Sequence, residues 1–264
     1  MVFRRDGEIS TMNDLLISLL VFAVISGGAL LGAALRPLLS ESHLQPDSKD
    51  VVKMATGLIG TLAALVLGLL IASAKSSFDQ KTNQVRQMTA KIILLDELLA
   101  QYGPETIPVR TRLRQSIEPL ADNIWHEGRL PAGKPEHFEA SAQSLAFENE
   151  LESLSPSNDS QRSLQSRAIS AFTEGARTRL LLYAQAGGSI PAPFLIILVF
   201  WLGAIFVSFT LFARTNLVVM ASLLICALSF AGAIFLVLEL DSPFTGLMGI
   251  SSATLRNALL PLSP

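Results

Sequence analysis

Uncharged apolar residues are concentrated in four windows of the chain, at residues 15–35, 54–74, 193–213 and 216–238. As helices, windows of this length are long enough to cross a hydrocarbon layer of about 30 Å. The apolar runs are continuous rather than alternating, which disfavours a transmembrane β-barrel. The pattern therefore predicts four transmembrane helices and excludes a purely soluble enzyme.

Most of the polar residues form one block between the second and third windows. Helical periodicity in this block predicts helices at about 108–127, 136–154 and 160–185, and little in it resembles a strand. Pro119 removes a backbone hydrogen bond inside the first of these helices, so we expect that helix to kink or split there. The fold class is therefore an all-α polytopic membrane protein with a helical domain between its second and third spans.

Three parts follow from this division of the chain. They are an N-terminal membrane hairpin at 1–74, a helical domain at 75–191, and a C-terminal membrane hairpin with a short tail at 192–264. Ser251 or Ser252 is placed to cap a last short helix in that tail.

The second span is expected to continue far beyond the membrane. No proline occurs from residue 47 to residue 103, and Gly103-Pro104 is a stop signal, so residues 48–102 are expected to form one helix. Its apolar residues repeat at heptad spacing, at Phe78, Val85, Met88, Ile92, Leu95, Leu99 and Tyr102. The same phase continues back through Gly57, Gly60, Ala64, Leu67, Ile71 and Ala74. This face packs either against helices of the same subunit or around a symmetry axis shared by several subunits.

Charge adds an orientation to this picture. The chain is 50% hydrophobic and 16% charged, with a net charge of −2, which gives no sign of a nucleic-acid partner. Of its 20 Lys and Arg residues, 16 lie in the N-terminus, the polar block and the C-terminal tail, which share one side if there are four spans. The positive-inside rule then places both termini and the helical domain in the cytoplasm of a multi-pass protein of the inner (cytoplasmic) membrane.

No constellation of residues indicates an enzyme. The phosphate-binding, zinc-protease and hydrolase motifs are missing, His126 and His137 have poor spacing for a metal, and the single cysteine is Cys226. We therefore expect no cofactor and no metal. Gly28 and Gly32 form a small-residue pair that is typical of close helix packing.

Two acidic residues directly follow the fourth apolar window. Glu239 and Asp241 cannot share one helix face, so they do not predict an acid–base pair. Asp241 or Ser242 is placed to cap a helix that begins at Pro243. The alternatives are that the acids line an ion path or form a salt bridge with Lys75 or Arg256.

The run at residues 238–246, Leu-Glu-Leu-Asp-Ser-Pro-Phe-Thr-Gly, resembles the L-E-x-D-x-P-F-x-G signature of the bestrophin-like family of bacterial membrane proteins, a domain family of unknown function. Residues 68–74 and 77–79 resemble that family's exit from the second span. Many members carry an acidic residue soon after this span, in an E-A-x-x-I stretch. This chain has Thr-Ala-Lys-Ile-Ile at residues 89–93 instead, so it lacks that acid.

The resemblance implies a functional arrangement as well as a fold. Bestrophins are pentameric ion channels whose second membrane helices surround the pore. By this analogy the chain is an oligomeric channel for small anions in the lipid bilayer. Its pore and gate candidates are Gly57, Gly60, Ala64, Leu67 and Ile71, and its C-terminal motif residues are Glu239, Asp241, Pro243, Phe244 and Gly246. The alternative is a non-conducting sensory or interaction protein that acts through its helical domain.

Overall fold

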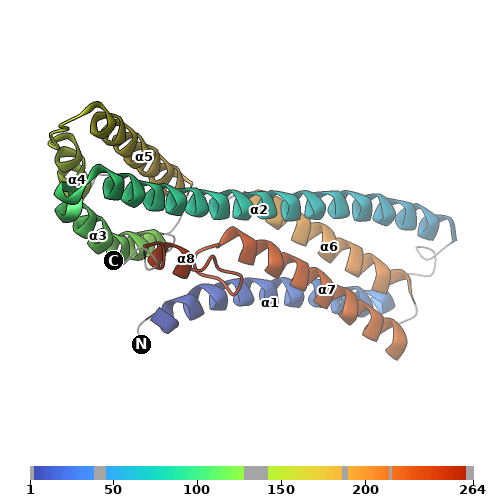
Figure 1. Ribbon diagram of the computed structural model, residues 1–264. Helices are drawn as coiled ribbons and strands as arrows, with labels where there is room; N and C mark the ends of the chain where they lie inside the picture. The colour runs from blue at the N-terminus through green and yellow to red at the C-terminus, as the bar shows by residue number, and fades with distance from the viewer. Residues whose placement is uncertain (1–2, 39–45, 128–141, 186–189, 214–215, 260–264) are drawn as a thin grey trace. The chain divides into compact units, whose positions relative to one another are not determined.

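The structure, a computed structural model, describes residues 3–38, 46–127, 142–185, 190–213 and 216–259, and these residues contain no strand (Figure 1). The helices are α1 (Phe3–Leu35), η1 (Arg36–Leu38), α2 (Pro46–Tyr102), η3 (Pro104–Thr106), α3 (Ile107–Glu127), α4 (Ala142–Glu152), α5 (Asp159–Ala184), α6 (Ala192–Phe212), α7 (Leu217–Asp241) and α8 (Ala253–Arg256). Four of them, α1, α2, α6 and α7, are long and apolar enough to cross a membrane. The predicted all-α class with four such helices is therefore confirmed.

The chain divides into two compact units. Unit 1 comprises Met1–Ser77, Ser189–Ser242 and Gly246–Met248, and unit 2 comprises Phe78–Gly188, Pro243–Thr245 and Gly249–Pro264. The single continuous helix α2 contributes residues to both units. Residues 249–259 group with unit 2, whereas the sequence analysis placed the range 192–264 with the membrane hairpin.

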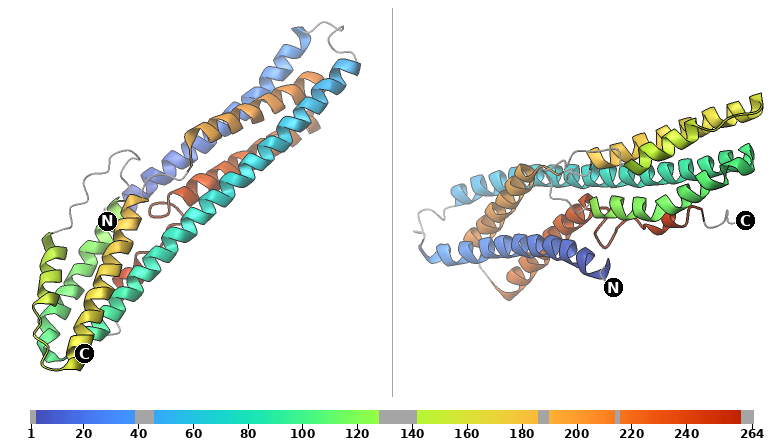
Figure 2. Two further views of the ribbon diagram at one scale, coloured as in Figure 1. Left: turned by 90° about the horizontal axis from the view of Figure 1, so that it is seen from above. Right: turned by 90° about the vertical axis from the view of Figure 1, so that its left-hand side faces the viewer.

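In unit 1, α1 packs along both α6 and α7 (Figures 1 and 2). The buried side chains of this contact include Ile25 of α1, Leu202 and Phe206 of α6, and Ile234 of α7. These side chains form the buried apolar core between α1, α6 and α7.

Glycines on α1 allow α6 to approach closely. A Cβ atom built at Gly28 would lie 3.0 Å from the carbonyl oxygen of Gly203, and one at Gly32 would overlap Thr210 and Val207. The close packing expected from the Gly28 and Gly32 pair is therefore confirmed, because a Cβ atom has no room at Gly32 and would meet the α6 backbone tightly at Gly28.

In unit 2, the heptad residues of α2 form the core together with α3, α4 and α5. The buried members of the series are Val85, Met88, Ile92, Leu95, Leu99 and Tyr102. In this part of the chain the apolar face is thus covered by the chain's own helices, which is the first of the two alternatives for that face. Lys81, the polar exception in the heptad, is also buried, with 4% of its surface exposed.

The turn between α2 and α3 depends on one glycine. Gly103 has a φ of 138°, in the region that favours glycine, and it ends α2 as expected. The hydroxyl of Thr106 then donates hydrogen bonds to the carbonyl oxygens of Leu99 (2.5 Å) and Gly103 (2.8 Å). These bonds satisfy backbone oxygens that the end of the helix would otherwise leave unpaired.

Two of the predicted helices differ from the structure. α3 does not split at Pro119 but continues to Glu127, because the residues around the proline, such as Ile117 and Ala121, are held in the core of unit 2. α4 ends at Glu152, and residues 136–141 of the helix expected at 136–154 lie outside the described residues. The expected helix at 160–185 agrees with α5, which the side chain of Asn158 caps by accepting a hydrogen bond from the Gln161 backbone N–H at 2.8 Å.

The tail after α7 carries α8. Ser252 occupies the position before the helix but makes no capping hydrogen bond with its side chain, whereas the hydroxyl oxygen of Ser251 accepts one from the backbone N–H of Ala253 at 3.2 Å. Leu255 of this short helix is completely buried in the core of unit 2. The tail is therefore an integral part of that unit.

Candidate functional site

Glu239, in the last turn of α7, is almost completely buried, with 1% of its surface exposed. Its Oε1 atom accepts a hydrogen bond from the backbone N–H of Met248 at 3.1 Å. A carboxylate that accepts a backbone N–H makes a stronger hydrogen bond than a neutral acceptor does. Glu239 therefore fastens the loop that follows α7 back onto the end of its own helix.

Gly246 lies against this carboxylate. A Cβ atom built at Gly246 would overlap the Oε1 atom of Glu239 and would also lie too close to Cδ and Oε2. The position requires glycine because of this contact and not because of an unusual φ, since Gly103 is the one described residue with a φ in the positive range. The glutamate and the glycine of the C-terminal motif therefore form one local arrangement within unit 1.

The sequence prediction for Asp241 as a helix cap is wrong. Asp241 is the last residue of α7 and is half-buried, and no helix begins at Pro243. The next residues form turns instead, in which the backbone N–H of Gly246 donates to the carbonyl of Ser242 at 3.2 Å and that of Ile250 to the carbonyl of Pro243 at 2.7 Å. Pro243 would suit the first turn of a helix, but this preference does not produce one. The turns use the carbonyl groups of Ser242 and Pro243 for their own hydrogen bonds.

Asp14 was not singled out in the sequence. It lies on α1 with 8% of its surface exposed and interacts electrostatically with Glu239 and Asp241. The sequence did contain a signal that could have identified Asp14. It directly precedes the first apolar window, just as Glu239 directly follows the fourth. With an even number of spans, these two ends share one side. Unit 1 therefore contains a cluster of three carboxyl groups from α1 and α7.

The remaining motif residues, Pro243 and Phe244, belong to unit 2. The ring of Phe244 packs edge-on against Trp125 of α3, with 5.5 Å between ring centroids. The indole Nε1–H of Trp125 in turn donates to the carbonyl of Ile250 at 2.9 Å. The motif therefore contributes to the packing of each unit, through Glu239 and Gly246 in unit 1 and through Phe244 in unit 2.

Arg256 of α8 forms ion pairs within unit 2. It binds Glu118 and Asp122 on α3, the second at 2.5 Å. This pairing attaches the tail to α3.

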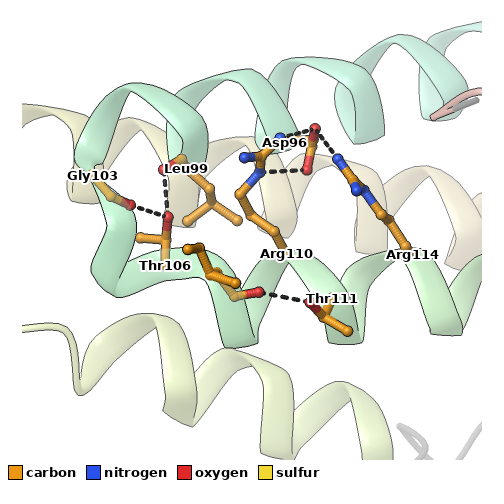
Figure 3. Close-up of polar contacts among 8 residues, drawn as sticks. Asp96, Leu99, Gly103, Thr106, Arg110, Thr111 and Arg114 are labelled. Atoms are coloured by element: carbon orange, nitrogen blue, oxygen red, sulfur yellow. Dashed lines mark hydrogen bonds and ion pairs between the residues drawn. The ribbon is translucent and has the colours of Figure 1, made fainter. Parts of the chain in front are cut away.

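Arg114 and Arg110 face Asp96 of α2 (Figure 3). Asp96 is 1% exposed, and Arg110 donates to both of its oxygens, from Nε to Oδ1 and from Nη2 to Oδ2, each at 2.9 Å. Arg114 lies 3.7 Å from Oδ2. The hydrogen bonds with Asp96 raise the pKa of the Arg110 guanidinium above its ordinary value, so Arg110 keeps its positive charge.

Lys91 lies in the segment 89–93, which lacks the acidic residue discussed in the sequence analysis. Its side chain forms an ion pair with Glu174 of α5. Together with Asp96, it joins α2 to its neighbours in unit 2 by charge as well as by apolar packing. No group of three or more His, Cys, Asp or Glu side chains is placed to hold a metal ion within the part of the chain that the structure describes.

In its membrane half, α2 buries Ala74 of the heptad series, but its other buried residues lie beside that series. The buried residues are Thr56, Ala63, Leu70 and Ala74. A straight helix drifts by about 20° per heptad away from a strict seven-residue repeat. The buried face of unit 2, followed back along a straight α2, therefore arrives at Ala63 and Leu70 rather than at Ala64 and Ile71.

The exposed surface of this half of α2 consists of two rows that differ in side-chain size, at about 100° per residue around the helix. One row is large and apolar, at Leu58, Leu62, Leu65 and Leu69. The other, which we call the small-residue row, comprises Gly57, Thr61, Ala64 and Gly68, and the larger Ile71 ends it. Three of the five pore candidates, Gly57, Ala64 and Ile71, are thus exposed, whereas Gly60 and Leu67 are half-buried and border the core of unit 1.

α2 is the least covered of the four membrane helices. Within the chain, 17% of its most apolar stretch is buried, compared with 28% for α6 and α7 and 33% for α1. The small-residue row therefore lies open over its length in unit 1.

Unit 2 contains a cavity of about 690 Å³ between α2, α3, α4 and α5. Its walls are mainly apolar and include Ile92, Leu113, Phe147 and Phe172, while Arg177 and Arg179 of α5 are among the charged residues that line it. A cavity of this size and character is typical of small-molecule sites.

Four apolar helices of membrane-spanning length and a second, helical unit define a polytopic helical membrane protein. The family model for the Bestrophin-like domain matches residues 23–255. The chain therefore belongs to the bestrophin-like family. Searches of curated proteins and of solved structures found no match.

Proposed function

We propose that the chain is the subunit of a homo-oligomeric channel for small anions, in which α2 of each subunit lies next to the symmetry axis. The proposal places the protein in the inner membrane with both termini and unit 2 in the cytoplasm, following the lysine and arginine asymmetry of the sequence. It gives the protein no enzymatic role. Membership of the bestrophin-like family supports it, since bestrophins are pentameric ion channels.

The observation that carries the proposal is the open small-residue row of α2. A helix face that contacts only lipid does not require small residues. The neighbouring row, with Leu58, Leu62 and Leu65, has the large apolar side chains that are typical of a lipid-facing surface. Small side chains instead let further helices approach closely, or leave space along an axis. The occupant that fits best is a second copy of α2, because the described residues of unit 1 leave the row uncovered.

A ring of such helices has the properties of a gated pore. Gly57, Thr61 and Ala64 leave a wide path at one end, and Ile71 places an apolar ring farther along. Apolar constrictions close pores by excluding water. Ile71→Ala should therefore raise anion flux by widening the constriction.

The placement of the row is tested by cysteine accessibility in a Cys226→Ser background. Ala64→Cys and Leu65→Cys are matched, since both residues are exposed within the chain and adjacent on α2. A water-soluble thiol reagent should modify Ala64→Cys in the reconstituted protein and should leave Leu65→Cys, which faces lipid, unmodified. Equal modification of both variants would show that the small-residue row does not line the pore.

The channel itself is tested by mass and by flux. The detergent-solubilised protein should have the mass of a symmetric oligomer, and vesicles that contain it should release chloride faster than empty vesicles. A monomeric mass, or vesicles that leak no small ion faster than empty ones, would discard the channel.

The second candidate function is a non-conducting sensory or interaction protein that acts through unit 2. The cavity between α2, α3, α4 and α5 favours it, because a scaffold that senses a small molecule needs such a space. If the protein forms an oligomer whose axis excludes water and conducts no ion, the sensory or interaction function would be favoured over the channel.

A further inference from the structure

The charged residues nearest to the uncharged segment of α2 are lysines at both of its ends. Lys53 precedes the segment and Lys75 follows it, and residues 54–74 carry no charge. The 22 steps between the two lysines correspond to about 33 Å of helix at 1.5 Å per residue. This length is close to the thickness of the hydrocarbon layer, so the lysines mark the two ends of the membrane passage.

Both lysines lie on the same face as the small-residue row. Lys53 is four residues before Gly57 and Lys75 is four residues after Ile71, which places each about one helical turn beyond an end of the row. The side chain of Lys53 is 73% exposed, and Lys75 is also exposed. They therefore continue the row in both directions.

We propose that Lys53 and Lys75 determine the preference of the channel for anions. This inference rests on the proposed function, because it needs α2 of several subunits around one axis. With one copy of each lysine per subunit, the two ends of the passage carry rings of positive charge, which raise the local concentration of anions and repel cations.

Acidic residues lie near both lysines and oppose them. Asp50 forms an exposed ion pair with Lys53 at 3.6 Å, and Asp79 follows Lys75 by one turn on α2. Both acids are farther from the uncharged segment than the lysines are. An ion entering that segment from either end therefore passes the lysine last, and the lysine sets the sign of the local charge at the entrance.

The test measures the chloride-to-potassium permeability ratio of the purified full-length protein in planar bilayers, from the reversal potential under a KCl gradient. The wild type should prefer chloride. Lys53→Gln and Lys75→Gln should each lower the ratio at least about twofold, because one unit charge about 10 Å from an ion in water changes its Boltzmann weight by that factor. Lys75→Arg, which keeps the charge, should retain the ratio, and Asp50→Asn should raise it.

Arg162→Gln is the matched control. Arg162 is an exposed arginine of α5 that pairs with Asp159, so its substitution removes the same charge away from α2 and should leave the ratio unchanged. Elution volume and helical content establish that each variant is folded and assembled. If Lys53→Gln and Lys75→Gln conduct with the wild-type ratio, the role of the lysines is overturned and the channel stands. If the wild type passes no ion, both proposals are overturned.

Discussion

The α-carbon of Gly246 lies so close to the carboxylate of Glu239 that no side chain fits between them. Gly246→Ala should therefore destabilise the protein, since the alanine methyl group must displace Glu239 from its hydrogen bond with Met248. Overpacking of this kind costs about 1–3 kcal/mol. Thermal unfolding in detergent measures the loss.

A double-mutant cycle shows whether the cost arises at this contact. In a Glu239→Ala background, Gly246→Ala should add little further loss, because the group it would displace is already gone. Additive losses would show that the glycine is needed for some other reason.

Glu239→Ala should destabilise the protein more than Asp241→Ala does, which is the reverse of what the capping pattern in the sequence suggested. Glu239 is buried and accepts a hydrogen bond from the loop, whereas Asp241 is half-buried and caps no helix. Loss of a hydrogen bond to a charged group costs about 1.5–3 kcal/mol. Equal melting temperatures for the two variants would contradict this assignment.

Asp96→Ala should be among the most damaging substitutions in unit 2. It leaves Arg110 without its partner in a place where Arg110 is 24% exposed, and breaking a buried pair in this way costs about 3–5 kcal/mol. Because Arg110 retains some contact with water, we expect the lower end of that range. Arg162→Gln, which breaks an exposed pair in the same unit, serves as the comparison and should leave the melting temperature nearly unchanged.

Gly32→Ala should weaken the packing of α1 on α6, whereas Gly27→Ala should be tolerated. A Cβ atom at Gly32 would overlap Thr210 and the backbone of Val207, while one at Gly27 meets nothing within 4 Å. The two glycines lie on the same helix, so the comparison removes any difference in helix propensity. A similar fall in the yield of folded protein for both would mean that the α1–α6 contact is not the cause.

The proposed orientation predicts which loops are reached from outside the cell. In a Cys226→Ser background, an impermeant thiol reagent should label Leu217→Cys, at the exposed start of α7, and should not label Ser157→Cys in unit 2 of intact cells. The opposite pattern would invert the topology.

The sequence by itself determined the elements. Uninterrupted apolar runs predicted α1, α2, α6 and α7, because a hydrocarbon layer demands about 20 such residues from any helix that crosses it. Gly103-Pro104 predicted the end of α2, because glycine alone readily takes the positive φ found there. Gly28 and Gly32 predicted close packing, because small residues are what adjoining helices require.

The tertiary structure decided the partners. Glu118 binds Arg256 and Arg114 faces Asp96, which are 138 and 18 residues away in the chain. Local spacing does not report which distant segments arrive at a side chain, so it also missed Asp14 beside Glu239 and the contact between Glu239 and Gly246. Along most of the membrane half of α2, the face that the chain itself buries also lies beside the heptad series, although Ala74 of that series is buried. A heptad count assumes a repeat of 3.5 residues per turn, whereas a straight helix has 3.6, and the difference accumulates along α2 until a neighbouring row of residues takes the buried place.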